Sequence, residues 1–158
     1  MLKNYPKQYM ASKNSPYHIT SGAVVYRISN KNIEFLLLVR KEQCGNTYHL
    51  PKGTVFLGES LEDAAKREVL EETGALVDLQ TYIGAVTKQF NYKDCNYDKT
   101  SHYFVAKFVK FVAKHDSEHD DIIWANANKA IELLNKSPKS EALFVERTVN
   151  FVAGVTNS

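Results

Sequence analysis

The pattern of hydrophobic and polar positions divides the chain into strand-like segments, one well-marked helix and a helical C-terminal part. Two pairs of β-rich segments predict two antiparallel hairpins, 19–28 with 33–39 and 77–92 with 102–112. The first pair is joined by the turn-forming sequence 29–32, and the second by a polar loop at 93–101. A β-sheet therefore accounts for much of the chain.

A helix is predicted between Ser60 and Gly74. Ser60 followed three residues later by Asp63 is typical of a helix N-terminus, and acidic residues in the first turn suit the positive end of the helix dipole. Glycine commonly ends a helix, so Gly74 predicts the C-terminus. The sequence Pro51-Lys52-Gly53 predicts a loop ahead of this helix.

The C-terminal part predicts a short apolar segment at 122–124 followed by two helices. One runs from about Asn126 to Leu134, and the other from Ser137-Pro138 to about Ala153, because proline suits the first helical position. This order of elements predicts a layered α+β domain. Residues 1–18 are polar and predict an N-terminal arm, which leaves 19–155 as the single domain.

Composition and charge narrow the class of protein. A chain of 158 residues with 44% hydrophobic residues has the size of one globular domain. Its formal net charge of +2 gives no strong sign of a nucleic-acid surface, and its longest apolar stretch, 35–39, is far too short to span a membrane. Cys44 and Cys95 lack CxxC spacing, and the N-terminus does not resemble a signal peptide, so a cytoplasmic location is expected.

The predicted helix has an unusual distribution of charge. At about 100° per residue, Glu68, Glu71 and Glu72 fall on the same side as the apolar residues of the helix. The opposite side carries the remaining charged residues, Glu62, Asp63, Lys66 and Arg67. No lysine or arginine is therefore expected beside the three inward glutamates. Crowded, partly buried carboxylates repel one another and require a counter-charge.

A divalent cation is the counter-charge that this spacing favours. Glu68, Glu71 and Glu72 stand at i, i+3 and i+4, which stacks their carboxylates on adjacent turns. Hard oxygen ligands favour Mg²⁺ or Mn²⁺, and the sequence has no cluster of histidines or cysteines that would favour zinc. The alternative is a solvated stripe of charge on a surface helix.

The same glutamates belong to a longer motif. Gly53 is followed after five residues by Glu59, and after seven more by the sequence Arg67-Glu68-Val69-Leu70-Glu71-Glu72-Thr73-Gly74-Ala75. This motif resembles the Nudix box at all seven fixed positions. Ala75 stands where the family usually has a larger aliphatic residue, which is expected to affect packing more than chemistry. The resemblance covers about 19–153 and implies a Nudix fold, an α/β/α sandwich around a mixed sheet.

The resemblance also implies a reaction and the roles of the box residues. Nudix hydrolases use these carboxylates to hold Mg²⁺, which bridges the substrate's phosphates and polarises a water for attack on phosphorus. Glu68, Glu71 and Glu72 match the metal ligands, and the backbone of Gly53 is expected close to the metal. Glu59 and Arg67 match residues that orient the carboxylates, with a structural salt bridge as the alternative.

Features outside the box resemble the asymmetric diadenosine tetraphosphate hydrolase branch of the family. They are Pro51-Lys52, Asn91-Tyr92, Lys99-Thr100, Tyr103 and Glu118-His119 with the following Trp124. Lys52 is expected to contact the phosphate chain as a point charge, and Lys88 and Arg27 are further candidates. Trp124 is expected to pack in the core.

The remaining candidates lie in the second hairpin and in the loop after it. Tyr92 and Tyr103 are candidates for stacking on adenine, although aromatic residues also pack across strands for structural reasons. Glu118 is expected to act as a further metal ligand or general base, with simple solvent exposure as the alternative. His119 next to it is a candidate for orienting phosphate.

The sequence thus predicts a Mg²⁺-dependent pyrophosphohydrolase with a small nucleotide substrate. The leading candidate is diadenosine tetraphosphate, cleaved to ATP and AMP. Because the box does not select a substrate, nucleoside triphosphates, capped RNA ends and diphosphoinositol phosphates stay open. A non-catalytic nucleotide sensor is the alternative of another class, but a sensor would be free to lose glutamates that this chain keeps.

Overall fold

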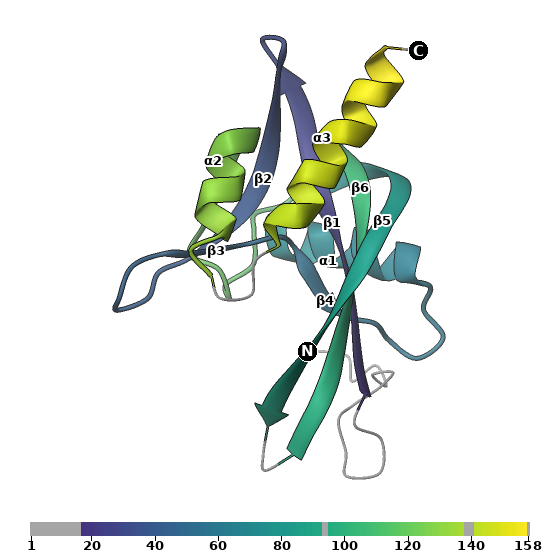
Figure 1. Ribbon diagram of the computed structural model, residues 1–158, viewed down its shortest axis with the longest axis vertical. Coiled ribbons are helices and arrows are strands. Elements are labelled where there is room, and N and C mark those ends of the chain that lie inside the picture. Colours follow the sequence, from purple (N-terminus) through teal and green to yellow (C-terminus); the bar gives the residue numbers. More distant parts are fainter. Residues whose placement is uncertain (1–16, 93–94, 138–140, 158) are drawn as a thin grey trace.

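The computed structural model describes residues 17–92, 95–137 and 141–157, without the side chains of Phe90, Tyr92 and Cys95. Within these ranges the strands form one sheet that the helices cover (Figure 1). The strands are β1 (Tyr17–Ser29), β2 (Asn32–Arg40), β3 (Thr47–His49), β4 (Lys52–Thr54), β5 (Ala75–Tyr92), β6 (Cys95–Phe111) and β7 (Asp121–Asn126). The helices are α1 (Leu61–Thr73), α2 (Ala127–Leu134) and α3 (Ala142–Thr156).

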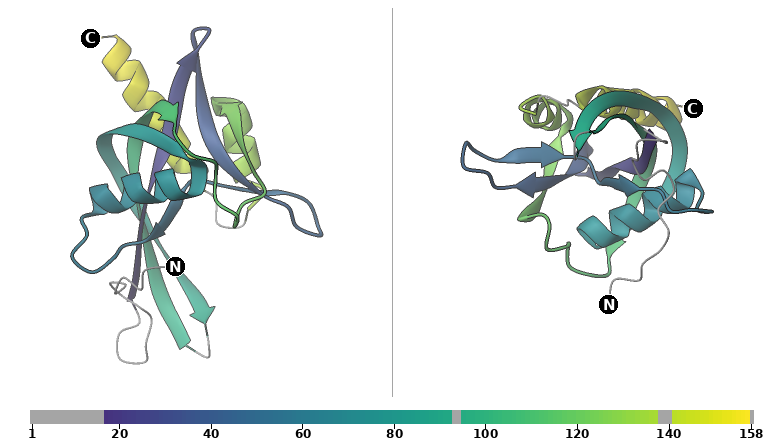
Figure 2. Two further views of the ribbon diagram at one scale, coloured as in Figure 1. Left: turned by 180° about the vertical axis from the view of Figure 1, so that it is seen from behind. Right: turned by 90° about the horizontal axis from the view of Figure 1, so that it is seen from below.

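The helices lie on both faces of the sheet. Helix α1 covers one face, and α2 and α3 cover the other, as the opposite views in Figures 1 and 2 show. Strand β1 pairs in parallel with β6 and antiparallel with β2 and β4, so the sheet is mixed. These observations confirm the predicted α+β class and the α/β/α sandwich around a mixed sheet.

The central strands are apolar on both faces because helices cover both. In β1, Val24 belongs to the core beneath α2 and α3, whereas Val25 belongs to the core beneath α1. In β2, Leu37 and Leu36 divide between the same two cores. A strand that is buried on both sides shows a continuous apolar run in its sequence rather than alternation.

The local signals at the first hairpin and at α1 are confirmed. Asn30 and Lys31 adopt φ angles of 48° and 68°, the left-handed backbone that a two-residue hairpin turn requires. The side chain of Ser60 accepts a hydrogen bond from the backbone N of Asp63 at 3.0 Å. Gly74 ends α1 with φ of 74°, and a Cβ there would lie 2.0 Å from the carbonyl oxygen of Ala113.

Three predictions in the strand region are wrong. The polar segment 95–101 is strand rather than loop, because it pairs with β5 on one edge and with the start of β1 on the other. The same pairing draws residues 17 and 18 into β1, whereas residues 1–16 of the predicted arm lie outside the described residues. Segment 52–54 is a short strand because it pairs with β1.

The last helix begins at Ala142 rather than at Ser137, whose backbone N instead closes a turn onto Leu134. Pro138 lies outside the described residues. Trp124 packs edge-on against Phe108 next to the core under α1, close to its expected role. No helix in the described ranges is both long enough and apolar enough to cross a membrane.

Candidate active site

Glu68 projects from α1 into a space that only glycine leaves open. Glu68 is 9% exposed, and its carboxylate lies against β4. A Cβ on Gly53 would lie 2.2 Å from Cδ of Glu68 and 2.3 Å from both carboxylate oxygens, which is sterically impossible without displacement. Strand β4 is fixed in this position by its pairing with β1, where Gly53 stands opposite Ser21. Gly53 is therefore required for close approach.

Arg67 supplies an internal counter-charge to three glutamates. Its guanidinium contacts Glu59 at 2.7 Å, Glu68 at 2.6 Å and Glu71 at 3.1 Å. It also donates to the carbonyl of Thr54 at 2.9 Å and lies 3.8 Å above the ring of Phe56. We call Glu59, Arg67, Glu68 and Glu71 the Arg67 cluster.

The Arg67 cluster corrects the prediction from the helical wheel. Arg67 was expected on the outer side, yet its side chain is only 19% exposed because its length lets it fold back toward Glu68. Glu71 was expected to point inward, yet its side chain is 56% exposed. The expectation that no cation would stand beside these carboxylates is therefore wrong.

The pKa values in this cluster follow from the pairing. Burial alone would raise the pKa of Glu59, but the hydrogen bonds from Arg67 and from the backbone of Phe56 outweigh it and lower that pKa. For Glu68 burial prevails and raises the pKa despite the contact with Arg67. Burial opposes the charge of Arg67, yet its hydrogen bonds to Glu59 and Glu68 raise its pKa. Arg67 is therefore a permanent cation.

Glu72 stands outside this cluster and has no cationic partner among the described residues. Its carboxylate accepts one hydrogen bond, from the backbone N of Lys52 at 3.0 Å, and it forms no ion pair with any described residue. Burial, followed by the charges of Glu68 and Asp116, raises the pKa of Glu72 to about 8. Without an added counter-charge this carboxyl group therefore keeps its proton at neutral pH.

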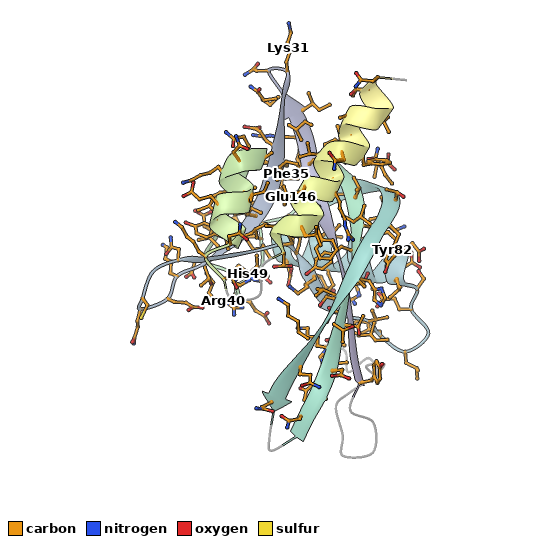
Figure 3. The ribbon with its side chains drawn as sticks, in the orientation of Figure 1. Lys31, Phe35, Arg40, His49, Tyr82 and Glu146 are labelled. Atoms are coloured by element: carbon orange, nitrogen blue, oxygen red, sulfur yellow. The ribbon has the colours of Figure 1, made fainter. Side chains whose placement is uncertain are left out.

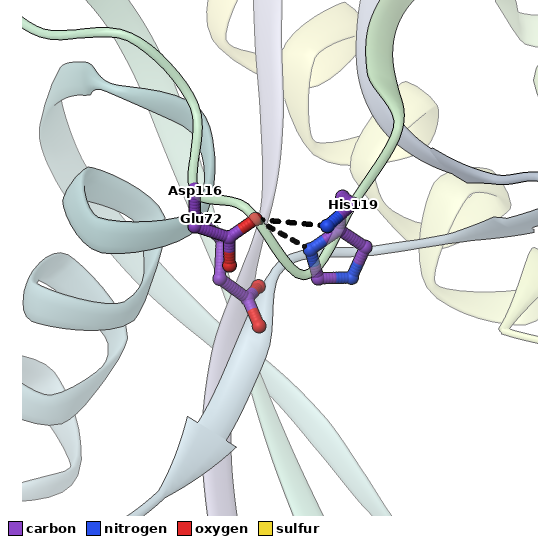
Figure 4. Close-up of side chains that lie close together, drawn as sticks. All are labelled: Glu72, Asp116 and His119. Atoms are coloured by element: carbon purple, nitrogen blue, oxygen red, sulfur yellow. Dashed lines mark hydrogen bonds and ion pairs between the residues drawn. The ribbon is translucent and has the colours of Figure 1, made fainter.

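Two residues of the loop before β7 approach Glu72 (Figure 4). The backbone N of Asp116 donates to the carbonyl of Glu72 at 3.2 Å, which docks the loop on the end of α1. Asp116 Oδ1 contacts Nδ1 of His119 at 2.9 Å and accepts from its backbone N at 3.1 Å. Ligand atoms of Glu72, Asp116 and His119 all lie within 4.8 Å of one another, and we call these residues the Glu72 cluster.

The Glu72 cluster fits a divalent cation. It offers two carboxylates and an imidazole, one of the carboxylates is uncompensated, and Glu68 lies close enough to raise its pKa. Sequence reasoning singled out Glu72 and His119 but missed Asp116, whose only signal was membership of the acidic stretch 115–121. It assigned His119 to phosphate, whereas the structure places its imidazole within ligand distance of Glu72 and Asp116.

Two adjoining pockets extend from this corner and share Lys52 and Lys99. The first pocket contains the Glu72 cluster residues Glu72 and His119 and is further lined by Leu38, Arg40, His49, Leu50 and Glu118. The second is further lined by Val86, Lys88, Ser101, Tyr103 and Glu141. Burial lowers the pKa of His49. Figure 3 labels Arg40 and His49, which come from β2 and β3.

Basic side chains concentrate at these pockets. Lys88 and Lys99 stand directly opposite each other in the β5–β6 ladder, and both line the second pocket. Both ammonium groups are therefore placed where an anionic ligand in that pocket could contact them. Arg40 adds a positive charge to the first pocket. Sequence reasoning missed Arg40 and His49, because neither lies in a motif.

Lys52 lies where the two pockets meet, bound to Glu141. Its Nζ is 2.9 Å from Oε2 of Glu141, a buried residue that sequence reasoning missed. The hydroxyl of Tyr103 donates to the same oxygen. Tyr103 is 1% exposed and its ring packs on Phe144 at 4.2 Å, so its position agrees with the packing role that the sequence left open.

The other candidate residues predicted from the sequence do not all line the two pockets. Glu118 is exposed on the first pocket, and Lys88 lines the second. Arg27 pairs with Glu34 at 2.7 Å and lies 4.0 Å above the ring of Trp124, and it lines neither of the two pockets. The side chain of Tyr92 lies outside the described part of the structure.

Comparison with known proteins gives a family and two groups of relatives. The family model described as the NUDIX domain matches residues 16–147. Nudix hydrolase 21, chloroplastic, of Arabidopsis thaliana is 32% identical over 137 residues, which are 83% of this chain and 68% of that protein. The asymmetrical bis(5'-nucleosyl)-tetraphosphatase of Sus scrofa is 32% identical over 123 residues, 71% of this chain and 81% of that protein.

A solved structure resembles the fold over most of its length. The crystal structure of a C. elegans Ap4A hydrolase in a binary complex superposes with a TM-score of 0.70 at 25% sequence identity. The alignment covers 87% of this chain and 98% of that one. The similarity therefore includes both helical layers and the sheet between them.

Proposed function

Since the chain belongs to the NUDIX family and is a hydrolase of phosphoric anhydride bonds, we propose that its substrate is a dinucleoside polyphosphate. The leading candidate is diadenosine tetraphosphate, cleaved to ATP and AMP with Mg²⁺. Relatives named as asymmetrical tetraphosphatases and a structural neighbour named as an Ap4A hydrolase support this choice. The predicted Nudix fold is confirmed by the same family match and structural likeness.

One observation carries the substrate proposal. The pocket that contains Glu72 continues past Lys52 and Lys99 into a second pocket, where Lys88 faces Lys99 across the sheet. A chain of four phosphates is long and strongly anionic, so it requires several cations placed in a row rather than one. Arg40, Lys52 and the two opposed lysines provide that row, and lysine contacts phosphate as a point charge.

The residues of the chain divide the work of hydrolysis. The Glu72 cluster would hold Mg²⁺, with Glu68 as the further ligand that the motif predicts. When bound, Mg²⁺ supplies charge neutralisation for the phosphates and a water of lowered pKa. Lys52 and Lys99 bind phosphate oxygens and keep the scissile bond beside Glu72. Arg67 orients Glu59 and Glu68 through its hydrogen bonds.

Glu118 is our candidate for the general base. It lies on the same pocket as Glu72 but outside the Glu72 cluster, and its exposed carboxylate has no part in the Arg67 cluster. A carboxylate in this place accepts the proton of the attacking water and releases it to solvent. Only the motif supports Glu71 as a metal ligand, because its described contact is with Arg67.

A substrate panel tests the proposal. Purified protein with Mg²⁺ is incubated with diadenosine tetraphosphate, nucleoside triphosphates, capped RNA and diphosphoinositol phosphates, and products are separated by chromatography. We expect the fastest cleavage for diadenosine tetraphosphate, with equal amounts of ATP and AMP, and none after chelation. Faster cleavage of another member would refute the substrate and leave the hydrolase class intact. Binding without cleavage of any member would favour the sensor alternative.

The proposed location is the cytoplasm. Cys44 is an exposed free cysteine, and free surface thiols persist in a reducing compartment. Subcellular fractionation of cells that express the native chain should recover it with cytosolic markers. Recovery with an organelle or a secreted fraction would contradict this location.

A further inference from the structure

Glu141 is a buried carboxylate to which the proposed reaction gives no role. It occupies the N-cap position of α3 and is 5% exposed, yet its side chain forms no hydrogen bond to the start of that helix. N-cap positions favour short side chains that accept from first-turn N–H groups. A residue that departs from such a local rule in a folded protein is often at a functional site.

The carboxylate of Glu141 instead binds the segment that leads into β4. Its Oε2 accepts from Nζ of Lys52 at 2.9 Å and from the hydroxyl of Tyr103. Its Oε1 accepts from the backbone N of Leu50 at 3.3 Å. All these donors come from parts of the chain at least 38 residues away, so the contacts join α3 to the edge of both pockets.

Lys52 is consequently held at both ends by glutamates. Its backbone N donates to Oε2 of Glu72 at 3.0 Å, and its ammonium group is fixed by Glu141. An unrestrained lysine side chain loses rotamer entropy when it binds a phosphate. Holding the ammonium group in advance removes much of that cost and fixes the distance between Lys52 and Glu72.

We propose that Glu141 is a positioning residue for the hydrolysis, which holds the ammonium group of Lys52 at the junction of the two pockets so that it meets a substrate phosphate beside Glu72. The proposal rests on the proposed function. A residue that only anchored α3 would affect stability whether or not Lys52 is present. The two roles of Glu141 can therefore be distinguished by experiment.

A double-mutant cycle separates the two roles. Glu141→Gln, Lys52→Met and the double variant are compared with the native protein for kcat/KM on the substrate that the panel identifies. We expect Glu141→Gln to lower kcat/KM about tenfold, mainly through kcat, when Lys52 is present. In the Lys52→Met background the same change should have an effect of less than about twofold. An equal loss in both backgrounds would overturn the proposal.

The cycle has matched controls. Glu146 lies on the exposed side of the same helix and is labelled in Figure 3, and Glu146→Gln should leave kcat/KM unchanged. Thermal unfolding of every variant checks that α3 stays docked. If Glu141→Gln fails to fold, Glu141→Asp replaces it, because the shorter carboxylate keeps the charge and withdraws it from Lys52.

A second measurement does not depend on activity. In protein labelled with ¹⁵N-lysine, an ammonium group held by a carboxylate exchanges slowly with water and gives a Nζ signal, which Lys52→Met would assign. We expect this signal to disappear in Glu141→Gln, or in Glu141→Asp if that replaces it, and its persistence would overturn the proposal. A protein that cleaves no member of the panel would refute the proposed function, and this signal would still show whether Glu141 holds Lys52.

Discussion

The Arg67 cluster and the Glu72 cluster share one helix and contain the same type of side chain, but their charges are balanced differently. In the Arg67 cluster a guanidinium touches three carboxylates at 3.1 Å or less. In the Glu72 cluster the carboxylate of Glu72 accepts one hydrogen bond from a backbone N–H and lies near two residues of a distant loop. Its pKa rises to about 8. The first cluster has an internal cation, whereas the second has none among the described residues and fits an added one.

This difference shows that a count of glutamates in a motif does not identify the ligands of a cation. Residues one position apart, Glu71 and Glu72, face different partners, because Arg67 reaches the first and the loop at 113–119 reaches the second. Glu68 lies between the clusters, bonded to Arg67 by one oxygen and close enough to Glu72 to affect its pKa. Substitutions in the two clusters should therefore have different effects.

The largest effect is expected for Glu72→Gln. Removal of the uncompensated carboxylate should lower kcat/KM by about 10²–10⁴ with Mg²⁺ present, a loss typical of an essential acid, base or ligand. The same change should leave the free energy of unfolding without cation unchanged or higher, because no internal ion pair is lost. Glu62→Gln, on the exposed side of α1, is the control and should match the native rate. Native-like turnover by Glu72→Gln would remove the Glu72 cluster from the mechanism.

Arg67→Met should have the opposite profile, with stability as its main effect. It leaves Glu59 and Glu68 buried without their counter-charge, so urea unfolding should show a loss of about 3 kcal/mol. Lys66→Met is the matched control, because Lys66 is half exposed and its contact with Asp63 spans 3.5 Å, so its loss should stay below about 1 kcal/mol. Equal losses for the two variants would mean that the Arg67 cluster is not a structural unit.

The difference in pH dependence between the native protein and Glu72→Gln should report the contribution of Glu72 to stability. Its pKa is about 8 when folded and 4.5 in an unstructured chain, so the cation-free folded protein keeps a proton that the unfolded chain loses. This contribution to stability is complete below pH 4.5 and disappears as the pH rises through about 8. Stabilisation by added Mg²⁺ should grow over the same range, because the cation competes with that proton.

Urea titrations at pH 5.5, 7 and 8.5, with and without Mg²⁺, measure both trends. Glu72→Gln should lack the part of both trends that Glu72 contributes, since the neutral amide has no proton to lose. A cation-free native protein whose free energy of unfolding differs from that of Glu72→Gln by the same amount at all three pH values would refute the raised pKa of Glu72.

The smallest effect is expected for Glu71→Gln. Its side chain is 56% exposed and its partner Arg67 keeps two other carboxylates, so stability should change by less than about 1 kcal/mol. We expect kcat/KM to fall far less than in Glu72→Gln, because the described contact of Glu71 is with Arg67 and not with the Glu72 cluster. The motif assigns Glu71 to the metal, so a loss as large as that of Glu72→Gln would show that Glu71 leaves Arg67 when the cation binds.

Local signals in the sequence were sufficient for the scaffold of the site. The cap at Ser60, the end at Gly74 and the turn at 29–32 depend on interactions within a few residues, and the structure confirms all three. The inward position of Glu68 follows from the helical period and is also confirmed. These features place the glutamate helix, but they do not select its partners.

Long-range contacts explain what the sequence did not reveal. Glu141 and Lys52 are 89 positions apart, and Asp116 reaches Glu72 only because a loop docks on the end of α1. The strand at 95–101 is polar, so its sequence resembles a loop until β1 pairs with it. Arg67 escaped the wheel argument because a helical wheel gives the direction of Cβ and not that of a long side chain.

The parallel pairing of β1 with β6 limits how early the sheet can form during synthesis. Tyr17 stands opposite Asp98, so the first strand waits for some eighty residues before its neighbour exists, and such distant pairings form slowly. A growing chain therefore contains its whole glutamate motif well before Asp116 and His119 leave the ribosome. A nascent chain with the complete motif therefore still lacks two of the three Glu72 cluster residues that would hold a cation.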